Sequence, residues 1–358
     1  MARISSVPSG AGPGRIPQDC DAGSALLENK TTLAKKKGIP MKTKPILAVS
    51  ILTIGTLLAS IAPGRASAMV FQPGEFLVDS YNAGTIQRYS PDGTYLQTYA
   101  GTSNALAVAA LTADGRLVVA SSGGVAPATV DIFAADGTRL TTFPLHNGAV
   151  VTDVDVFPNG TLAIIGFPNQ VEYWTQTGMF IQTVGSSLLS PTGSTIGSDG
   201  GLFVGGSNSF NVVKFTSDGS VVGGFNTGQG LNTFRPDELV MNPVDGTLWV
   251  SGSGVIGGSD GRIHHMTTSG VEISSFVTTG AQNPFALALA TDHNSLYVGD
   301  EGNPVVKHYD LAGNLLGSVN FNHSTPSRVI VVPTPEPGTF ALLGLGTLLL
   351  AARRRRSA

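Results

Sequence analysis

The sequence predicts an all-β protein folded as a six-bladed β-propeller, with four antiparallel strands in each blade. Three observations predict this fold. A unit of 41 to 51 residues occurs six times, each unit holds two glycine-type turns, and apolar residues recur at fixed positions around those turns. Glycine makes up 46 of the 358 residues and charged residues only 13%, which indicates many tight turns and few charged helices.

The first repeated element is a glycine turn between two strands. A large apolar residue stands four positions before each glycine and another apolar residue stands six positions after it, without a gap in any of the six copies. These glycines are Gly93, Gly137, Gly178, Gly219, Gly270 and Gly313.

A second turn lies upstream in each unit. An apolar residue stands two and four positions after the turn residue, as in "TADGRLVVA" and "PVDGTLWVS". This period of two is typical of a strand with one buried face, and Asp-Gly between two such runs is a strong hairpin signal. Each unit therefore contains four strands. The turn residues are Gly74, Gly115, Gly160, Gly200, Gly246 and Asn294.

The two ends of the repeated region complement each other. The first unit begins at "GEFLVDS" without an inner strand, and the last unit is followed by a strand without a partner, "PSRVIVV", from Pro326 to Val332. We expect these two strands to pair and close the ring, which removes the exposed sheet edges of an open array. Residues 69–332 then form one domain.

Two stretches, "EFLVDSYNAGTIQRYSPDGTYLQTYAG" and "NSLYVGDEGNPVVKHYDLAGNLLGSV", resemble NHL repeats. Their shared pattern is an apolar strand ending in Asp79 or Asp300, an Asn-containing loop, a strand ending in an aromatic residue, and a polar turn. The middle units depart from it, with Ala, Gly or Ser near the aspartate position. The resemblance implies an NHL-like propeller, a fold that hosts lactonases, lyases and binding scaffolds, so it implies fold more than function.

The N-terminal region predicts export. Residues 41–68 have the pattern of a secretory signal peptide, with two lysines before an apolar helical run at 46–62 and small residues, Ala66 and Ala68, marking cleavage after Ala68. A retained membrane anchor is the alternative. Residues 1–40 show no periodicity, and we expect them to be a disordered leader that reflects a start codon assigned too early.

The C-terminal region, residues 333–358, predicts a short transmembrane helix. Its apolar run from Thr339 to Ala352 has 14 uncharged residues. A helix of that length covers about 21 Å, and snorkelling arginines with local bilayer thinning make up the difference from about 30 Å. The alternative, a tail packed on the body, requires a polar face that this segment lacks. The following arginines, expected on the cytoplasmic side, are Arg353, Arg354, Arg355 and Arg356.

The order of parts in this tail resembles the PEP-CTERM sorting tail of exported Gram-negative proteins. Pro335, Glu336 and Pro337 come first, then the apolar span, then the arginine cluster. The resemblance implies recognition by an exosortase, after signal peptidase has acted at the N-terminus. It further implies an inner-membrane intermediate, followed by a location at the cell surface or outside the cell.

Charge and cysteine content exclude several classes of function. Between Met69 and Thr334 there are 8 Lys or Arg against 20 Asp or Glu, a net charge of −12. This charge opposes binding to nucleic acid or to an anionic membrane surface. The chain's single cysteine, Cys20, lies in the leader, so the body has neither a disulfide framework nor a thiolate metal site.

Candidate metal ligands are few. Asp153 and Asp155 alternate with valines in "VTDVDVF", so both carboxylates face one side of a predicted inner strand. If that side lines the channel they could hold calcium or another divalent cation, and a solvated channel wall is the alternative. Asp237-Glu238 and Asp300-Glu301 are expected in loops, from which they could add ligands. The adjacent pair His264-His265 is expected to point to opposite faces of a strand.

No nucleophile with a plausible base occurs at informative spacing, so no catalytic residue is assigned. Two function classes remain open. The first is a non-catalytic binding or structural module, with polysaccharide or an envelope protein as partner, because the PEP-CTERM resemblance implies a link to exopolysaccharide systems. The second is a metal-dependent hydrolase or lyase of the gluconolactonase type, which requires three or four convergent ligands.

Overall fold

The computed structural model describes residues 70–80, 85–100, 106–122, 127–146, 150–185, 188–227, 234–254, 261–278, 284–300, 303–321, 326 and 328–334. The chain divides into two units, residues 1–62 and 63–358, and every described residue belongs to the second. The predicted leader, the signal peptide and residues 335–358 of the sorting tail lie outside the described residues. Within the described ranges, no helix is long and apolar enough to cross a membrane.

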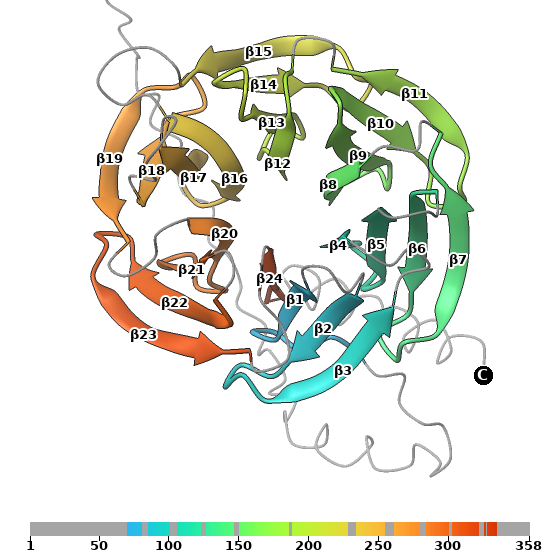
Figure 1. Cartoon of the computed structure of the whole chain (residues 1–358), viewed down its shortest axis with the longest axis horizontal. Coiled ribbons are helices and arrows are strands. Elements are labelled where there is room, and N and C mark those ends of the chain that lie inside the picture. Colours follow the sequence, from blue (N-terminus) through green and yellow to red (C-terminus); the bar gives the residue numbers. More distant parts are fainter. Residues whose placement is uncertain are drawn as a thin grey trace, which may run out of the picture. The chain divides into compact units, whose positions relative to one another are not determined.

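The described strands form six four-stranded antiparallel sheets arranged in a ring (Figure 1), which confirms the predicted propeller. Blade one comprises β24 (Val329–Val331), β1 (Phe76–Ser80), β2 (Thr85–Tyr89) and β3 (Tyr95–Ala100). Blade two comprises β4 (Leu106–Leu111), β5 (Leu117–Ser122), β6 (Thr129–Phe133) and β7 (Arg139–Pro144). Blade three comprises β8 (Val150–Val156), β9 (Leu162–Phe167), β10 (Gln170–Trp174) and β11 (Phe180–Val184).

The remaining three blades have the same order from the channel outward. Blade four comprises β12 (Pro191–Ile196), β13 (Leu202–Gly206), β14 (Asn211–Phe215) and β15 (Val221–Asn226). Blade five comprises β16 (Phe234–Asn242), β17 (Thr247–Gly254), β18 (Arg262–Met266) and β19 (Glu272–Val277). Blade six comprises β20 (Pro284–Leu289), β21 (Ser295–Asp300), β22 (Val305–Asp310) and β23 (Leu315–Asn320).

The closing strand β24 pairs with β1, as the sequence predicted, with Leu77 opposite Ile330 and Val78 opposite Val329. Backbone hydrogen bonds extend this contact at both ends, since Val332 N–H donates to the Glu75 carbonyl and Asp79 N–H donates to that of Arg328. The last strand of the chain therefore completes the first blade.

The turn glycines adopt the left-handed conformation that favours glycine, with φ between +70° and +89° at all eleven of them. In blade six the prediction of Asn294 as the turn residue is wrong. His293 has φ +58° and donates its N–H to the Ala290 carbonyl, as Gly160 does to the Phe157 carbonyl. This turn has one residue more before its strand, so alignment on the glycines shifted the position by one.

The repeated apolar residues of the first series pack between neighbouring blades. The residue six positions after each glycine contacts the residue four positions before the glycine of the next blade. Ring centroids lie 5.8 Å apart in Tyr99–Phe133, 5.2 Å in Phe143–Trp174 and 5.5 Å in Phe276–Tyr309. The repeat is thus a pattern of contacts between blades, and the described apolar core divides into clusters that span blade boundaries.

Candidate functional site at the channel

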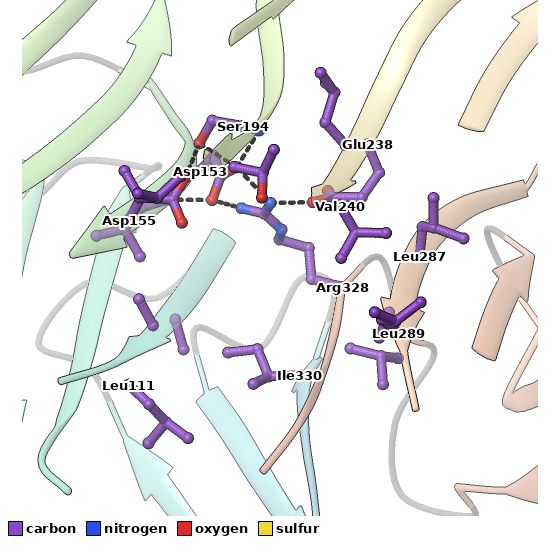
Figure 2. A pocket seen from close by; sticks show the side chains of 18 of the residues that line it. Leu111, Asp153, Asp155, Ser194, Glu238, Val240, Leu287, Leu289, Arg328 and Ile330 are labelled. Atoms are coloured by element: carbon purple, nitrogen blue, oxygen red, sulfur yellow. Dashed lines mark hydrogen bonds and ion pairs between the residues drawn. The ribbon is translucent and has the colours of Figure 1, made fainter. Parts of the chain in front are cut away.

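A cavity of about 370 Å³ lies where the inner strands converge. All six blades line it, through β4, β8, β12, β16, β20 and the segment that holds β24. Figure 2 shows polar side chains gathered around Arg328, while Leu111, Leu289 and Ile330 lie apart from that group. The cavity therefore has one polar region and one apolar region.

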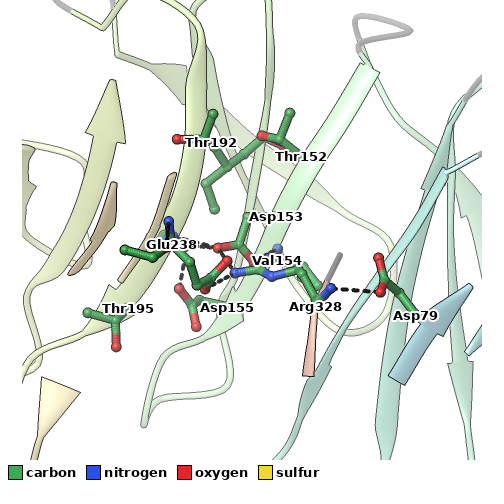
Figure 3. A network of polar contacts seen from close by, with 12 residues as sticks. Asp79, Thr152, Asp153, Val154, Asp155, Thr192, Thr195, Glu238 and Arg328 are labelled. Carbon is green, nitrogen blue, oxygen red and sulfur yellow. Dashed lines mark hydrogen bonds and ion pairs between the residues drawn. The ribbon is translucent and has the colours of Figure 1, made fainter. Parts of the chain in front are cut away.

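Arg328 is the cation of the polar region. Its guanidinium pairs with the Asp153 carboxylate through two nitrogens and with Glu238 Oε1 at 2.5 Å. Its backbone N–H donates to Asp79 Oδ1 at 2.7 Å (Figure 3). The Arg328 side chain is 12% exposed and the Asp153 side chain 1%, so these charges interact with little screening by water.

The three charged residues stand at equivalent positions of alternate blades. Arg328 belongs to the inner segment of blade one, Asp153 to that of blade three, and Glu238 to that of blade five. Each lies opposite a residue of the neighbouring strand in its own blade, five positions after the upstream turn glycine of that blade. The facing residues are Asp79, Ile165 and Ser251. The pseudo-symmetry of the fold thus brings one cation and two anions to the same level of the channel.

Ser194 of β12 joins the two aspartates of β8. Its Oγ lies 2.7 Å from Asp153 Oδ2 and 2.5 Å from Asp155 Oδ2, and its backbone N–H donates to Asp153 Oδ2 at 2.6 Å. We call Asp79, Asp153, Asp155, Ser194, Asp237, Glu238 and Arg328 the channel cluster. Of its carboxyl groups, Asp153, Asp155 and Glu238 line the cavity together with Arg328, Asp79 accepts the Arg328 backbone N–H, and Asp237 is included because its charge acts on Glu238.

Burial dominates the titration of the channel cluster. Burial raises the pKa of Asp155 to about 7, although the Ser194 hydrogen bond acts in the opposite direction. Burial, followed by the charges of Asp155, Asp79 and Asp237, raises the pKa of Glu238 well above its usual value. Burial also lowers the pKa of Arg328 to about 9. Proton uptake by carboxyls is the way such a site reduces its excess of negative charge.

Asp153 and Asp155 lie on one side of β8, since both carboxylates contact the same Ser194 hydroxyl and both line the cavity. That they bind a divalent cation stays a prediction. Asp153 is buried and ion-paired, which differs from the solvated wall given as the alternative. The described residues contain no group of three or more His, Cys, Asp or Glu side chains placed to hold a metal ion. The Arg328 guanidinium instead occupies the oxygens of Asp153.

The expectation that Asp237-Glu238 lies in a loop is wrong. Both residues lie in β16, next to a register shift between Pro236 and Glu238. Their side chains are buried, and Glu238 points to Arg328 in Figure 3. The proline two positions earlier suggested a loop, but a bulge accommodates it within the strand. Asp300 likewise ends a strand, β21.

The histidine pair of β18 is confirmed as two strand residues with different surroundings. His264 stacks on Phe234, with ring centroids 3.8 Å apart, and His265 stacks on Trp249 at 4.0 Å. The cavity lining contains no histidine. Aromatic packing accounts for the position of this pair.

Sequence reasoning missed Arg328. Two signals could have indicated it. It is one of only 8 basic residues between Met69 and Thr334, and it directly precedes an apolar inner strand, where a long charged side chain requires a partner across the channel.

Comparison with protein families finds the PEP-CTERM protein-sorting motif at residues 333–356. A search of curated proteins finds no match. The chain therefore carries this motif at its C-terminus, as its sequence indicated, and the motif implies export and sorting by an exosortase.

Solved structures share the fold at low identity. A protein of unknown function from Bacteroides caccae is 14% identical, with a TM-score of 0.57 over 72% of this chain and 98% of that one. Virginiamycin B lyase from Staphylococcus aureus is 16% identical, with a TM-score of 0.55 over 72% of this chain and 85% of that one. A functionally unknown protein from Desulfotomaculum acetoxidans is 14% identical, with a TM-score of 0.56 over 74% and 88%. These likenesses show the fold alone.

Proposed function

From a chain that joins a six-bladed propeller to a PEP-CTERM sorting motif, we infer an exported, non-catalytic binding or structural module of the cell envelope. The observation that carries this proposal is the junction between the two parts. The motif begins at residue 333, directly after the segment in which β24 completes blade one. The sorting motif is therefore attached directly to the strand that closes the propeller, so that sorting delivers the closed domain as one unit.

The route of export follows the order of signals in the chain. Signal peptidase cleaves after Ala68, so the mature protein begins at Met69. The apolar span and the arginines of the tail then hold the protein in the inner membrane, with the propeller outside. An exosortase acts at Pro335-Glu336-Pro337 and delivers the body to the cell surface or to extracellular polysaccharide.

The contacts of the channel support a non-catalytic role. The strongest charges of the cavity are paired with each other, Arg328 with Asp153 and Glu238. The Ser194 hydroxyl lies in the cavity beside two carboxyl groups, but no histidine lines the cavity to accept and return its proton. A channel in which the one guanidinium is engaged by carboxylates of two other blades is suited to holding the ring together, and the loops around it remain for binding.

Binding to exopolysaccharide is the first test. The exported protein is incubated with polysaccharide from the producing cells, and co-sedimentation is compared with that of a polysaccharide of unrelated composition. We expect retention on the cells' own polysaccharide that survives high salt, because the acidic body does not bind by charge. If the protein stays in the supernatant equally with both polymers, binding to exopolysaccharide is rejected and an envelope protein remains as the class of partner.

Metal analysis of the same preparation separates this proposal from a hydrolase or lyase. We expect less than stoichiometric calcium and zinc after dialysis. A stoichiometric divalent ion, together with turnover of a lactone that a chelator abolishes, would reject the non-catalytic role and support the metal-dependent class.

A further inference from the structure

The contacts of Ser194 with two carboxyl groups require that one of these carboxyls is protonated. The Ser194 Oγ lies within hydrogen-bond distance of both Asp153 Oδ2, at 2.7 Å, and Asp155 Oδ2, at 2.5 Å. A serine hydroxyl has one hydrogen and can donate to only one of them. The second short contact is favourable only when that carboxyl is itself protonated and donates to the lone pair of the Ser194 oxygen.

The surroundings assign this proton to Asp155. Asp153 receives two guanidinium nitrogens of Arg328 and the backbone N–H of Ser194, and each of these donors favours the ionised carboxylate. The hydrogen bond of Asp155 is to the Ser194 hydroxyl, and among the described residues that line the cavity the one cation, Arg328, pairs with Asp153 and Glu238. The proton therefore resides on Asp155, and the Ser194 hydroxyl donates to Asp153.

We propose that Asp155 and Ser194 form a proton-binding site in the channel, and that the bound proton stabilises the closed propeller. The protonated Asp155 donates to Ser194, Ser194 donates to Asp153, and Asp153 binds Arg328 beside the closing strand. This chain of contacts joins blades three, four and one. When Asp155 loses its proton, it becomes a second negatively charged carboxylate next to that of Asp153, and no further cation is added to balance it.

The charged groups around Asp155 come from three further elements. Asp79 belongs to β1, Asp237 and Glu238 to β16, and Arg328 precedes β24. The parts of β4 and β20 that line the cavity contribute only alanine and leucine. The single guanidinium is already engaged by Asp153 and Glu238, and an ionised Asp155 would be repelled by the charge of Glu238.

The direction of the pH effect follows from burial. Burial raises the pKa of Asp155 to about 7, above its ordinary value of 3.8. A carboxyl whose pKa is raised in the folded state gives a stabilisation that is complete below pH 3.8 and disappears as the pH rises through about 7. The bound proton therefore favours the closed propeller increasingly as the pH falls from about 7 towards 3.8, a dependence suited to a protein exposed to the external medium.

Thermal unfolding of the full chain in detergent tests this proposal. Ionisation of Asp155 lowers the Tm between pH 6 and pH 8 by about 3–5 °C, for a domain of this size. An Asp155→Asn variant keeps a donor to Ser194 and cannot ionise, so its Tm does not fall over this range, and its excess over the wild-type Tm is about 3–5 °C larger at pH 8 than at pH 6. As a matched control, Asp136→Asn changes an exposed turn aspartate and leaves the wild-type pH dependence unchanged.

Infrared spectroscopy of the wild-type full chain gives a readout that does not depend on the folding of a variant. We expect a C=O stretching component of a buried protonated carboxyl at pH 6, which shifts in heavy water and disappears towards pH 8. This pH-dependent component is missing from Asp155→Asn, whereas any band of protonated Glu238, whose pKa burial also raises, is common to both proteins. Identical Tm profiles for wild type and Asp155→Asn, or a wild-type spectrum without this pH-dependent component at pH 6, would overturn the proposal.

Discussion

Arg328 and Arg116 show how differently two ion pairs contribute in this propeller. Arg328 is buried between Asp153 and Glu238 in the channel, whereas the Arg116–Asp114 pair is 33% and 59% exposed at the surface. Exposed pairs contribute little because water screens them. Removal of one partner from a buried group leaves the other charge without compensation, at a much larger cost.

We therefore expect Arg328→Met to lower the free energy of unfolding by about 3–5 kcal/mol. The variant leaves Asp153, which is 1% exposed, without its cation. Urea unfolding followed by tryptophan fluorescence measures the change. The matched control Arg116→Met should cost less than about 1 kcal/mol. Similar losses in the two variants would show that the channel pairs do not hold the ring.

The turn is the element that explains the repeat. Gly313 has φ +88°, and a Cβ added there would lie 2.5 Å from Cβ and Cγ of Phe276 in the preceding blade. Gly115 has φ +80° but open space around it. Glycine is thus required for backbone conformation at both positions, and for packing between blades only at Gly313.

Alanine substitutions separate these two requirements. Gly115→Ala should cost about 1–2 kcal/mol, the penalty for a side chain in the left-handed region. Gly313→Ala should cost about 1–3 kcal/mol more than Gly115→Ala, because Phe276 must move away from Tyr309. Chemical denaturation of both variants measures the difference, and equal costs would mean that the Phe276 side chain adapts freely.

The closing strand is the second element with a specific role. β24 joins the end of the chain to β1, with Ile330 opposite Leu77. The outer edges of the blades are protected in a different way. In every blade the pairing between the third strand and the outermost strand shifts register, beside the residue four positions before the glycine of the turn that joins them. Such bulges twist an edge away from pairing with another chain.

Ile330→Pro should open blade one, because proline cannot donate a backbone hydrogen bond to β1. We expect loss of cooperative unfolding and aggregation at concentrations where the wild type stays monodisperse, measured by light scattering. Ile330→Val keeps the backbone donor and should lower the free energy of unfolding by only about 0.5–1.5 kcal/mol. A proline variant that melts like the valine variant would show that ring closure does not depend on β24.

At the scale of the whole molecule, the acidic propeller is followed directly by a basic, apolar tail. Residues 333–356 match the sorting motif, and the net charge of −12 between Met69 and Thr334 contrasts with four consecutive arginines near the C-terminus. The charge of the body disfavours contact with an anionic membrane surface, whereas the arginines resist passage through the membrane. This asymmetry supports an intermediate with the propeller outside and the arginines inside.

Glu336→Ala should therefore accumulate uncleaved in the inner membrane, because it lacks the charged residue between Pro335 and Pro337. Cell fractionation with an antibody against the propeller measures this, and wild type in cells without the exosortase should show the same accumulation. Thr334→Ala changes the residue just before Pro335-Glu336-Pro337, and this variant should be released normally. Normal release of the Glu336 variant would reduce the tail to a simple membrane anchor.

The sequence by itself determined the architecture of this protein, because its information is local and repeated. Turn glycines, alternating apolar residues and the unpaired strand at 326–332 each specify backbone structure over a few residues, and six copies make the pattern readable. The sorting motif is equally local. The same reasoning brought Asp153 and Asp155 together, since residues two positions apart on a strand share a face.

Only the tertiary structure decided what those carboxylates contact. Arg328 lies 175 residues from Asp153 along the chain, and Ser194 and Glu238 come from two other blades. Arg328, Asp153 and Glu238 stand at equivalent positions of the repeat, but that spacing does not show which of them contact each other, because only ring closure brings the inner strands together. Burial inside that ring then decides which carboxyl holds a proton and which pairs with the arginine, since both depend on the charges that the fold places around each group.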